Sequence, residues 1–599
     1  MPTRVLRTRN PNLNYHIPDA VTSNSDILDL LELSKPNNTK MPDQSASSKP
    51  PPSEWVPDRS QVSITQTKRK RTSQDSSQSP PEVTASTTTY KRVKSTTKAK
   101  RSAIMKNHSP APNGLPLSKL SSELQATLPP IPAFEPITHS SPEHAGHHLL
   151  PRSITNLEKI DPIHIWDLFW RSDFVSSLAN NTNLYAQEKR AELGEGGRDW
   201  TPVTAGDIYV WIGIQIHMGL LGLSPSIYWN HDDFLLPEDG LPMVHFMSRT
   251  RFEPIKRYFH VSPASSSSKS ITPTQPWYHK IEPLLSQMKK AAQVYWLPSS
   301  NTTFDEAMIL FTGRSVHITK MPNKPIGLGY KVFCLADHGY IYDFHLSSNA
   351  QGLHSVSEEA KTITDLTPTG QMVFSLMRQL QLRHRNRAWN VFMDNFFTTI
   401  PLLSALRKIG VGGCGTARAN QTGFPKEFKF DKKRAKLDYH FKSGIVRDEV
   451  GVLVWMDSAP VVMMTTIHHL DAEVEKERGF PGNKSTNATG AASEFQGQPS
   501  KNLQIPLVVH EYNQHKVGVD MADQHRTYYD VQSTSRRNWY PYFYWALEIS
   551  LINTLFIYRS LPRGDITHLQ FRLQVAWVLI YRGSSLQRAA SQNITHISC

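Results

Sequence analysis

Four aspartates stand in settings where a carboxylate could do chemistry. Asp394 interrupts the apolar run VFMDNFF (391–397), where an ionised carboxylate without a partner is unfavourable. Asp305 lies in TFDEAM, and Asp520 and Asp523 lie three residues apart in VGVDMADQ, on one face if the segment is helical. Converging carboxylates need cations, and hard divalent ions such as Mg²⁺ bind carboxylates together with water and phosphate oxygens. Two such ions would activate a nucleophile and stabilise a leaving oxygen on phosphorus.

Each aspartate also has a purely structural interpretation. Asp305 could face solvent beside Glu306, and Asp394 could accept a hydrogen bond from the turn that follows it. Asp520 and Asp523 could occupy the first turn of a helix, where the helix dipole favours negative charge. Asp305, Asp394 and the pair Asp520 and Asp523 are far apart in the sequence, so spacing alone does not decide between these interpretations and a shared site.

Hydrophobic patterning predicts the elements that would position the aspartates. Strand patterns hold Asp305 and end near Asp394, and a helical pattern begins near Asp520. Residues 329–348 predict a hairpin that turns at 337–339. The predicted strands lie in 302–311, 329–348, 388–397 and 449–467, and helices in 399–410, 515–532 and 539–559. Because strands and helices alternate, we expect a mixed α/β core.

The remaining ordered segments are mainly helical. Residues 155–300 show helical periodicity, with Thr204 as a candidate N-cap. The most apolar windows, 208–223 and 542–558, contain polar residues and predict buried helices rather than membrane spans. Residues 481–500 are polar and small and predict a linker. The three cysteines form no CxxC pair, which excludes a disulfide framework and a cysteine-based zinc finger, so we expect a soluble protein in a reducing compartment.

Residues 1–150 are rich in Ser, Thr, Pro and Lys and contain one of the 13 tryptophans. Such a segment cannot bury enough apolar surface to offset its ordering entropy, so we expect a disordered basic tail. The net charge of +14 favours polyanionic partners, nucleic acid before anionic membrane. Two basic runs predict nuclear import, with a tail that only aids solubility as the alternative. The residues of these runs are Lys68, Arg69, Lys70, Arg71, Lys91, Arg92, Lys98, Lys100 and Arg101.

The motifs of the ordered part, taken in order, resemble a piggyBac-type transposase, from a family of cut-and-paste DDE/D transposases. Matching stretches run through most of residues 160–582. They are NLYA (183–186), MSRTRFEPIKRYFHVS (247–262), FDEAMILFTGRS (304–315), MPNKPIGLGYKVF (321–333), GYIYDF (339–344), MDNFFTTIPLLSAL (393–406), GTARAN (415–420) and YNQHKVGVDMADQ (512–524). Each motif is weak alone, but their order and joint presence are specific.

This resemblance implies that Asp305, Asp394 and Asp520 form a catalytic triad and that Asp523 is an accessory acid. All four would bind metal, two Mg²⁺ or Mn²⁺ ions per active site, and the chemistry would need no other cofactor. The implied reaction cleaves transposon ends, passes through a DNA hairpin and joins the freed ends to TTAA-type target DNA. Relatives of this kind act on double-stranded DNA in the nucleus, usually as homodimers.

The implied fold is an RNase H-like catalytic core interrupted by an insertion domain. The expected scheme is a disordered basic tail (1–150), a mainly helical dimerisation and DNA-binding domain (151–300), the first part of the core (301–402), the insertion domain (403–509), the second part of the core (510–560), and a C-terminal helix with a short tail (561–599).

Basic and aromatic residues near the acids are candidate DNA contacts, because Arg and Lys hold phosphates and aromatic rings stack on unpaired bases. A solvated basic face is the alternative interpretation. Arg418 is the strongest single candidate, since it matches a basic position of the family motif. The candidates are Arg314, Lys320, Lys324, Lys331, Arg418, Arg526, Arg536, Arg537 and Trp539. The histidines show no ligand spacing that predicts a metal site.

The sequence departs from the family pattern in two places. No cysteine-rich zinc-binding module follows the helix predicted at 571–582, which bears on end recognition rather than on chemistry. Val517 replaces the first glycine of the motif before the third acid, and valine would be strained if that position needs a positive φ. Three functions therefore stay open: an active transposase, a domesticated nuclear DNA-binding protein without catalysis, and a stand-alone nuclease.

Overall fold

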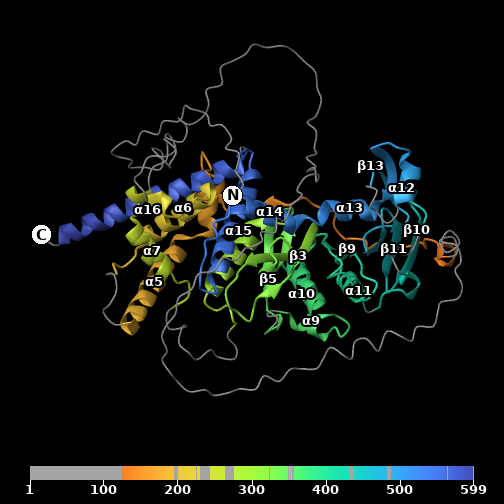
Figure 1. Cartoon of the computed structure of the whole chain (residues 1–599), viewed down its shortest axis with the longest axis horizontal. Helices are drawn as coiled ribbons and strands as arrows, with labels where there is room; N and C mark the ends of the chain where they lie inside the picture. The colour runs from red at the N-terminus through yellow and green to blue at the C-terminus, as the bar shows by residue number, and fades with distance from the viewer. Residues whose placement is uncertain are drawn as a thin grey trace, which may run out of the picture. The chain divides into compact units, whose positions relative to one another are not determined.

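The computed structural model describes residues 124–193, 200–223, 225–229, 243–263, 276–322, 324–348, 350, 352–353, 356–421, 423–430, 437–481, 488–562 and 564–597 (Figure 1). Residues 1–123 of the predicted basic tail (1–150) and both predicted import signals lie outside these residues, whereas residues 124–150 belong to the described structure.

A ten-stranded mixed sheet forms the centre of the described structure. Strand β3 (Asn301–Leu310) pairs in parallel with β8 (Asn390–Met393), which pairs in parallel with β9 (Gly412–Thr416). On its other side, β3 pairs antiparallel with β5 (Leu328–Asp337), followed by β6 (Tyr340–Ser348). The outer strands are β12 (Pro460–Thr465), β11 (Val450–Met456) and β10 (Lys442–Arg447) beyond β9, and β7 (Gly352–Leu353) and β4 (Thr319–Lys320) at the other side. The expected mixed α/β core is confirmed.

The hairpin predicted at 329–348 is present. Strands β5 and β6 are joined by His338 and Gly339, whose φ angles are 46° and 99°. Two positive φ angles in succession give the turn a twist that matches the flanking strands, and glycine adopts such angles without a Cβ clash. Most residues of both strands are buried, which explains why this hairpin shows little polar alternation.

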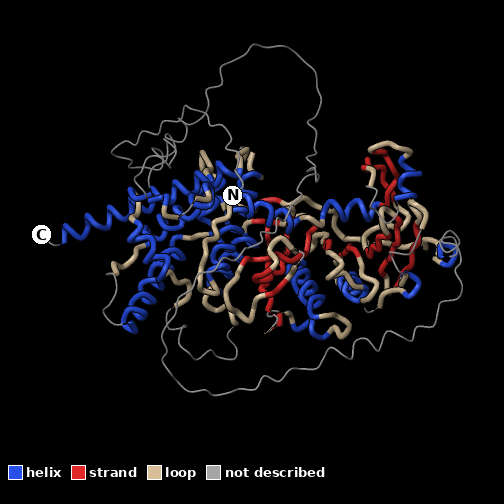
Figure 2. Tube along the Cα trace, viewed as in Figure 1, coloured by secondary structure: helices blue, strands red, loops and turns tan. Residues whose placement is uncertain are grey.

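Helices lie beside the strands of the central sheet, in blue and red respectively in Figure 2. After β8, helix α11 (Ile400–Lys408) begins at Thr399, whose hydroxyl accepts from the Leu402 N–H, and Pro401 lies in its first turn. Gly410 follows it at a φ of 77°. The other helices near the sheet are α9 (Glu358–Thr362), α10 (Pro368–Arg383), α13 (Leu507–His515) and α14 (Gly518–Tyr528).

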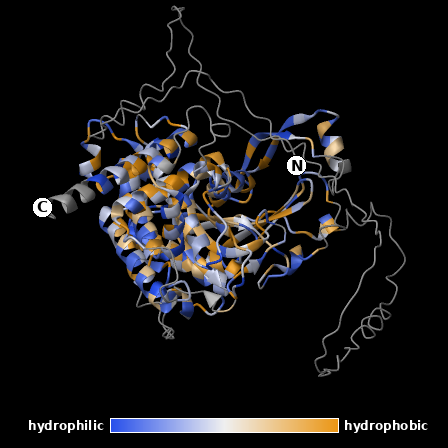
Figure 3. Ribbon diagram, turned by 60° about the vertical axis from the view of Figure 1, so that its left-hand side comes forward, coloured by the Kyte–Doolittle hydropathy of each residue, from blue (hydrophilic) through white to orange (hydrophobic). Residues whose placement is uncertain are grey.

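A second group of helices packs together through apolar faces. Helix α6 (Ala205–Leu221) begins with a capping box between Thr204 and Asp207, as the N-cap prediction requires. Helix α15 (Tyr540–Arg559) is buried almost all round. The other members are α4 (Pro162–Phe169), α5 (Ser172–Leu193), α7 (Arg249–Tyr258), α8 (Glu282–Val294) and α16 (His568–Ile597). Figure 3 shows apolar residues in orange along these packed helices. Among the described residues, no helix is long and apolar enough to cross a membrane.

Glycines let α6 and α16 approach closely. A Cβ on Gly213 would meet the Ala576 carbonyl oxygen at 2.7 Å, and a Cβ on Gly206 would meet the Gly583 carbonyl oxygen at 2.8 Å. Backbones at this separation leave no room for a side chain, so these positions require glycine. Helix α16 is therefore tightly attached to the helical group.

A small antiparallel sheet pairs β13 (Glu473–Gly479) with β14 (Ser500–Pro506). The linker predicted at 481–500 is wrong in part, because α12 (Ala488–Phe495) lies within it. Phe495 of this helix is fully buried, so burial of one apolar face stabilises a helix that polar composition concealed. The remaining elements are β1 (His147–His148) paired with β2 (Trp296–Leu297), α3 (Arg152–Thr155), and the 3₁₀ turns Ile227–Trp229, Met243–His245 and Lys426–Phe428.

Candidate active site

The register of two parallel strands places Asp305 and Asp394 side by side. Phe304 of β3 is opposite Met393 of β8, and the aspartates are the next residue in each chain. Both side chains are partly buried. Burial, then the carboxylates of Glu306 and Asp394, raise the pKa of Asp305 to about 8, against the opposing effect of Lys324. The two aspartates therefore share an electrostatic environment with excess negative charge.

Asp394 has a protein partner for one of its oxygens. The Phe396 N–H donates to Asp394 Oδ1 at 2.7 Å, so the structural interpretation of this residue holds in part. Burial and the Glu306 charge nevertheless raise the pKa of Asp394, although this hydrogen bond and Arg418 oppose the change. One hydrogen bond thus fixes the orientation of the carboxylate without satisfying its charge.

Helix α14 brings Asp520 and Asp523 to the same region by packing against β3, β5 and β6. A Cβ on Gly518 would meet Thr303 Oγ1 of β3 at 2.6 Å, so glycine permits this close approach. Val517, the departure from the family motif, has a φ of −92°. An ordinary φ means that valine is unstrained there. Gly518, the second glycine position of the motif, is therefore needed for packing. The first position, Val517 here, does not need glycine for its backbone conformation.

The two acids of α14 differ in exposure. Asp520 is exposed, whereas Asp523 is partly buried and accepts from Arg526 Nη1 at 2.6 Å. Burial raises the pKa of Asp523 although Arg526 opposes it, and the Asp520 charge adds to the rise. The Arg526 guanidinium also lies 3.4 Å from the Met308 carbonyl oxygen of β3. This arginine thus joins an acid of α14 to the strand that carries Asp305.

Lys324 lies among the acids of both elements. Its Nζ is 3.3 Å from Glu306 Oε1. Burial lowers the pKa of Lys324, but Asp305, Glu306 and Asp520 outweigh burial, and the net effect is a raised pKa. The ammonium group therefore supplies part of the positive charge that the carboxylates require.

Glu306 was not predicted as a functional residue, and the alternative interpretation in which Asp305 faces solvent beside it does not hold for Glu306. Its side chain is buried, and its Oε2 has no hydrogen-bond partner while lying 3.8 Å from the Nζ of Lys331. Its position beside Asp305 in TFDEAM was the available signal. The alternation along 302–311 predicted the strand but not this burial, because β3 is covered on both faces.

The donor chemistry of this acid cluster fits a hard divalent cation. Its ligands are carboxylate oxygens, the charge is in excess, and a buried Glu306 oxygen lacks a hydrogen bond. Within the described part of the chain, however, no three acidic, histidine or cysteine side chains are arranged to hold a metal ion. The structure thus gathers suitable ligands without closing a coordination shell.

Lys331 and Arg418 both lie over the ring of Phe396, at 4.5 and 5.6 Å from its centroid. Lys331 is buried, whereas Arg418 is exposed and donates through Nε to Asn395 Oδ1. The Phe396 side chain is 41% exposed, next to Asp394. Sequence reasoning missed Phe396, although the MDNFF motif contained it.

The other predicted DNA contacts fall into two groups. Arg314, Lys320 and Arg536 are exposed and available to an anionic ligand. Arg537 donates to the Phe259 carbonyl oxygen at 2.9 Å, and Trp539 is 7% exposed and packs on aromatic rings. The arrangement thus gives Arg537 and Trp539 a place in the protein core, not at a base-stacking surface.

Comparisons with known proteins identify the family of this chain. The family model described as transposase IS4, a DDE transposase domain, matches residues 161–555. The human PiggyBac transposable element-derived protein 2 is 25% identical over 433 residues, which cover 71% of this chain and 66% of that protein. The human PiggyBac transposable element-derived protein 3 is 24% identical over 431 residues, 69% of this chain and 64% of that protein. The matches thus span about two thirds of these relatives' lengths.

A solved structure shares the fold. The cryo-EM structure of a piggyBac transposase synaptic complex with hairpin DNA matches with a TM-score of 0.57 and 20% sequence identity. The match covers 76% of this chain and 88% of the solved one. By its domain model and its relatives, this chain belongs to the IS4-type DDE transposases and, among them, to the piggyBac transposable element-derived protein family.

Proposed function

We propose that this protein is a cut-and-paste DNA transposase that cleaves transposon ends and joins them to TTAA-type target DNA. The observation that supports it most is the register Phe304–Met393, which sets Asp305 beside Asp394 under the acids of α14. Carboxylates that converge at one point are the arrangement that metal-assisted phosphoryl transfer requires. The proposed partners are double-stranded DNA and a second copy of the chain, and the proposed compartment is the nucleus.

We assign the RNase H-like core to the strand order β6-β5-β3-β8-β9, three antiparallel strands followed by two parallel ones. Residue 402 lies inside α11, and β9 continues the same sheet, so the inserted segment of this proposal begins after β9 rather than at 403. The helices between 151 and 300 form the proposed N-terminal domain, and α13 and α14 begin the second part of the core.

Asp305, Asp394 and Asp520 would hold the divalent ions, with Asp523 as the accessory acid. When bound, Mg²⁺ or Mn²⁺ supplies Lewis acidity toward the attacking water and the leaving oxygen. Lys324 places a positive charge between the acids of β3 and those of α14, which limits their repulsion before ligand binds. Arg418 holds a phosphate, and the exposed Phe396 ring stacks on an unpaired base in the role first predicted for Trp539.

The proposed reaction is a sequence of displacements at phosphorus. Water adds to a phosphodiester at the element end, the bond from phosphorus to O3′ breaks, and the 3′ oxygen leaves as a hydroxyl. That hydroxyl attacks the opposite strand, which forms a hairpin and releases the flanking DNA. Water reopens the hairpin, and the same hydroxyl attacks target DNA. The two steps with water replace a phosphate ester bond by a P–OH group, and the two attacks by the 3′-hydroxyl exchange one phosphate ester bond for another, so no step needs an oxidant or an energy source.

A domesticated DNA-binding protein is the second candidate. The observation that favours it is the Lys324–Glu306 ion pair at 3.3 Å, which compensates part of the acid charge without a metal ion. A site that has lost its metals would keep such a pair, whereas an active site would open it when metal and DNA bind.

Nicking and strand transfer decide between these functions. The substrates are duplexes that carry TTAA beside the element's own termini, in Mg²⁺ or Mn²⁺. Asp394→Asn keeps the shape of the side chain and removes its charge, and the exposed Asp365→Asn is the matched control. We expect cleavage by the wild type and by Asp365→Asn and none by Asp394→Asn. DNA binding without cleavage by the wild type would support the domesticated protein, and cleavage without a defined joined product would support a nuclease.

A further inference from the structure

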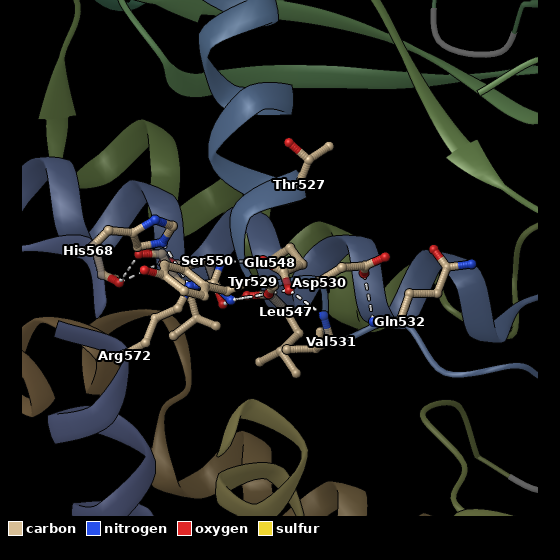
Figure 4. Close-up of polar contacts among 12 residues, drawn as sticks. Thr527, Tyr529, Asp530, Val531, Gln532, Leu547, Glu548, Ser550, His568 and Arg572 are labelled. Atoms are coloured by element: carbon tan, nitrogen blue, oxygen red, sulfur yellow. Dashed lines mark hydrogen bonds and ion pairs between the residues drawn. The ribbon is translucent and has the colours of Figure 1, made fainter. Parts of the chain in front are cut away.

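A buried polar network connects α15 and α16 to the segment that follows α14 (Figure 4). Arg572 of α16 forms an ion pair with Glu548 of α15, and both side chains are almost fully buried. The Arg572 Nε–H donates to His568 Nε2 at 2.7 Å. Figure 4 shows the Arg572 guanidinium and the Glu548 carboxylate directed at each other and at the backbone near Val531.

The network holds backbone groups as well as side chains. The Val531 N–H donates to Glu548 Oε1 at 2.9 Å, and Arg572 Nη1 donates to the Tyr529 carbonyl oxygen at 2.8 Å. Helix α14 ends at Tyr528, so these two bonds hold the chain directly after the helix of the proposed acids. The Glu548–Arg572 pair therefore holds the segment directly after α14, and we call this pair the clamp.

The clamped segment also touches the strand of Asp305. Gln532 Nε2 donates to the Leu310 carbonyl oxygen at the end of β3 at 2.6 Å. At the other end of α14, its first residue Gly518 packs closely against Thr303 of β3. Contacts at both ends of α14 thus hold this helix against β3. A shift of residues 529–532 would thus move Asp520 and Asp523 relative to Asp305.

Stability alone does not account for this pair. Replacing a buried ion pair by apolar residues of similar volume is often neutral or stabilising, because desolvation offsets the Coulomb attraction. What apolar residues cannot supply are an acceptor for the Val531 N–H and a donor for the Tyr529 carbonyl group. We propose that Glu548 and Arg572 are positioning residues that set the distance between the acids of α14 and Asp305, an inference that rests on the function proposed above.

Three variants separate positioning from simple support. Glu548→Gln keeps an acceptor for the Val531 N–H. The reversal Glu548→Arg with Arg572→Glu keeps the opposite charges but turns donors toward the Val531 N–H and acceptors toward the Tyr529 carbonyl. The apolar pair Glu548→Leu with Arg572→Met removes both. The matched control is Asp167→Leu with Arg582→Met, which removes a two-bond ion pair (2.8 and 3.0 Å) between α4 and the same helix α16.

Two readouts are measured on the full chain: amide hydrogen exchange over residues 529–532, and Mn²⁺ binding by the metal-free protein from the signal of free Mn²⁺. We expect the apolar and reversed pairs to exchange about tenfold faster at Val531 and to bind Mn²⁺ more weakly. The α4 control should stay near wild type in both readouts. Glu548→Gln keeps the acceptor for the Val531 N–H but leaves the Arg572 charge uncompensated, so it should bind Mn²⁺ as the wild type does although the protein is less stable.

Equal changes in the apolar pair and in the α4 control would overturn the inference, and so would wild-type Mn²⁺ binding in the reversed pair. If the reversed pair does not fold, the comparison of Glu548→Gln with the apolar pair carries the same test. If the wild type binds Mn²⁺ but never cleaves DNA, the proposed function is wrong. The positioning role of Glu548 and Arg572 is then still tested by hydrogen exchange and by Mn²⁺ binding.

Discussion

Arg572 and Glu548 form an ion pair with 0% and 2% of each residue exposed, although they stand on different helices. Removing one partner leaves a buried charge without compensation, which costs about 3–5 kcal/mol. We therefore expect Arg572→Met alone to lower the free energy of unfolding by about that amount. The apolar pair Glu548→Leu with Arg572→Met should regain part of it, because no buried charge remains although the Val531 N–H and the Tyr529 carbonyl oxygen lose their partners. Urea denaturation measures both, and a double variant no more stable than the single one would contradict this account.

His568 makes the protein sensitive to acid. Burial, then the Arg572 charge, lower the pKa of His568 from 6.5 to about 2. The unfolded chain thus binds a proton at His568 more readily than the folded chain does. The stability that depends on neutral His568 is therefore complete above pH 6.5 and is lost as the pH falls toward 2. One such group changes the free energy of unfolding by about 1.4 kcal/mol per pH unit in that window.

His568→Gln tests this prediction, since its side-chain oxygen can accept from Arg572 and does not titrate. Between pH 6.5 and 5.0 the wild type should lose about 2 kcal/mol more than the variant in urea denaturation. Other buried histidines contribute equally to both proteins, so parallel pH profiles would show that His568 is not the titrating group.

Gly518 is predicted to tolerate no side chain. The Cβ of Gly518→Ala would lie 2.6 Å from Thr303 Oγ1, which forces α14 away from β3 at a cost of about 1–3 kcal/mol. Gly479→Ala is the matched control, because nothing lies within 4 Å of its Cβ position. Thermal denaturation should show lower stability for Gly518→Ala, and a DNA nicking assay should show a lower rate. Gly479→Ala should change neither quantity.

Val517→Gly restores the family residue, and we expect no gain in activity from it. The native φ of −92° suits valine, so glycine only adds conformational freedom to the unfolded chain. Stability should fall by about 0.5–1 kcal/mol. A rise in nicking rate would mean that this segment adopts another conformation when DNA binds.

Phe396→Ala is expected to weaken binding of single-stranded DNA by about 1–3 kcal/mol, the usual contribution of one stacked base. Phe396→Tyr should bind as the wild type does, and Val316→Ala, at a residue 72% exposed, is the control for general surface effects. Fluorescence anisotropy measures these affinities. Trp539→Ala should instead lower stability by about 3–5 kcal/mol, because that ring is buried.

Local signals predicted the elements that carry the acids. The turn at 337–339, the cap at Thr204 and the start of α11 were predictable because glycine, threonine and proline act through their own backbone neighbours. The helix α12 was missed, because its stability comes from the burial of Phe495 and not from its composition.

The candidate site was predictable in its residues but not in its geometry. The pairing of Asp305 with Asp394 depends on the register of two strands that the sequence places 89 residues apart (394 minus 305). The burial of Glu306 and of Trp539 depends on what covers them from elsewhere in the chain. Those contacts are tertiary, and no local pattern records them.

The position of Arg572 in the chain has a consequence for synthesis. The acids of β3, β8 and α14 all emerge from the ribosome before α16, whose Arg572 compensates the buried charge of Glu548. Until that helix is made, the nascent chain holds an unpaired carboxylate within α15 and an unsupported end of α14. Domains usually fold as they emerge, but here α16, which is made after the acids, completes the support of the site that the acids form. Premature termination between 523 and 572 would therefore yield a chain that contains every proposed catalytic acid and lacks Arg572, which supports the segment after α14.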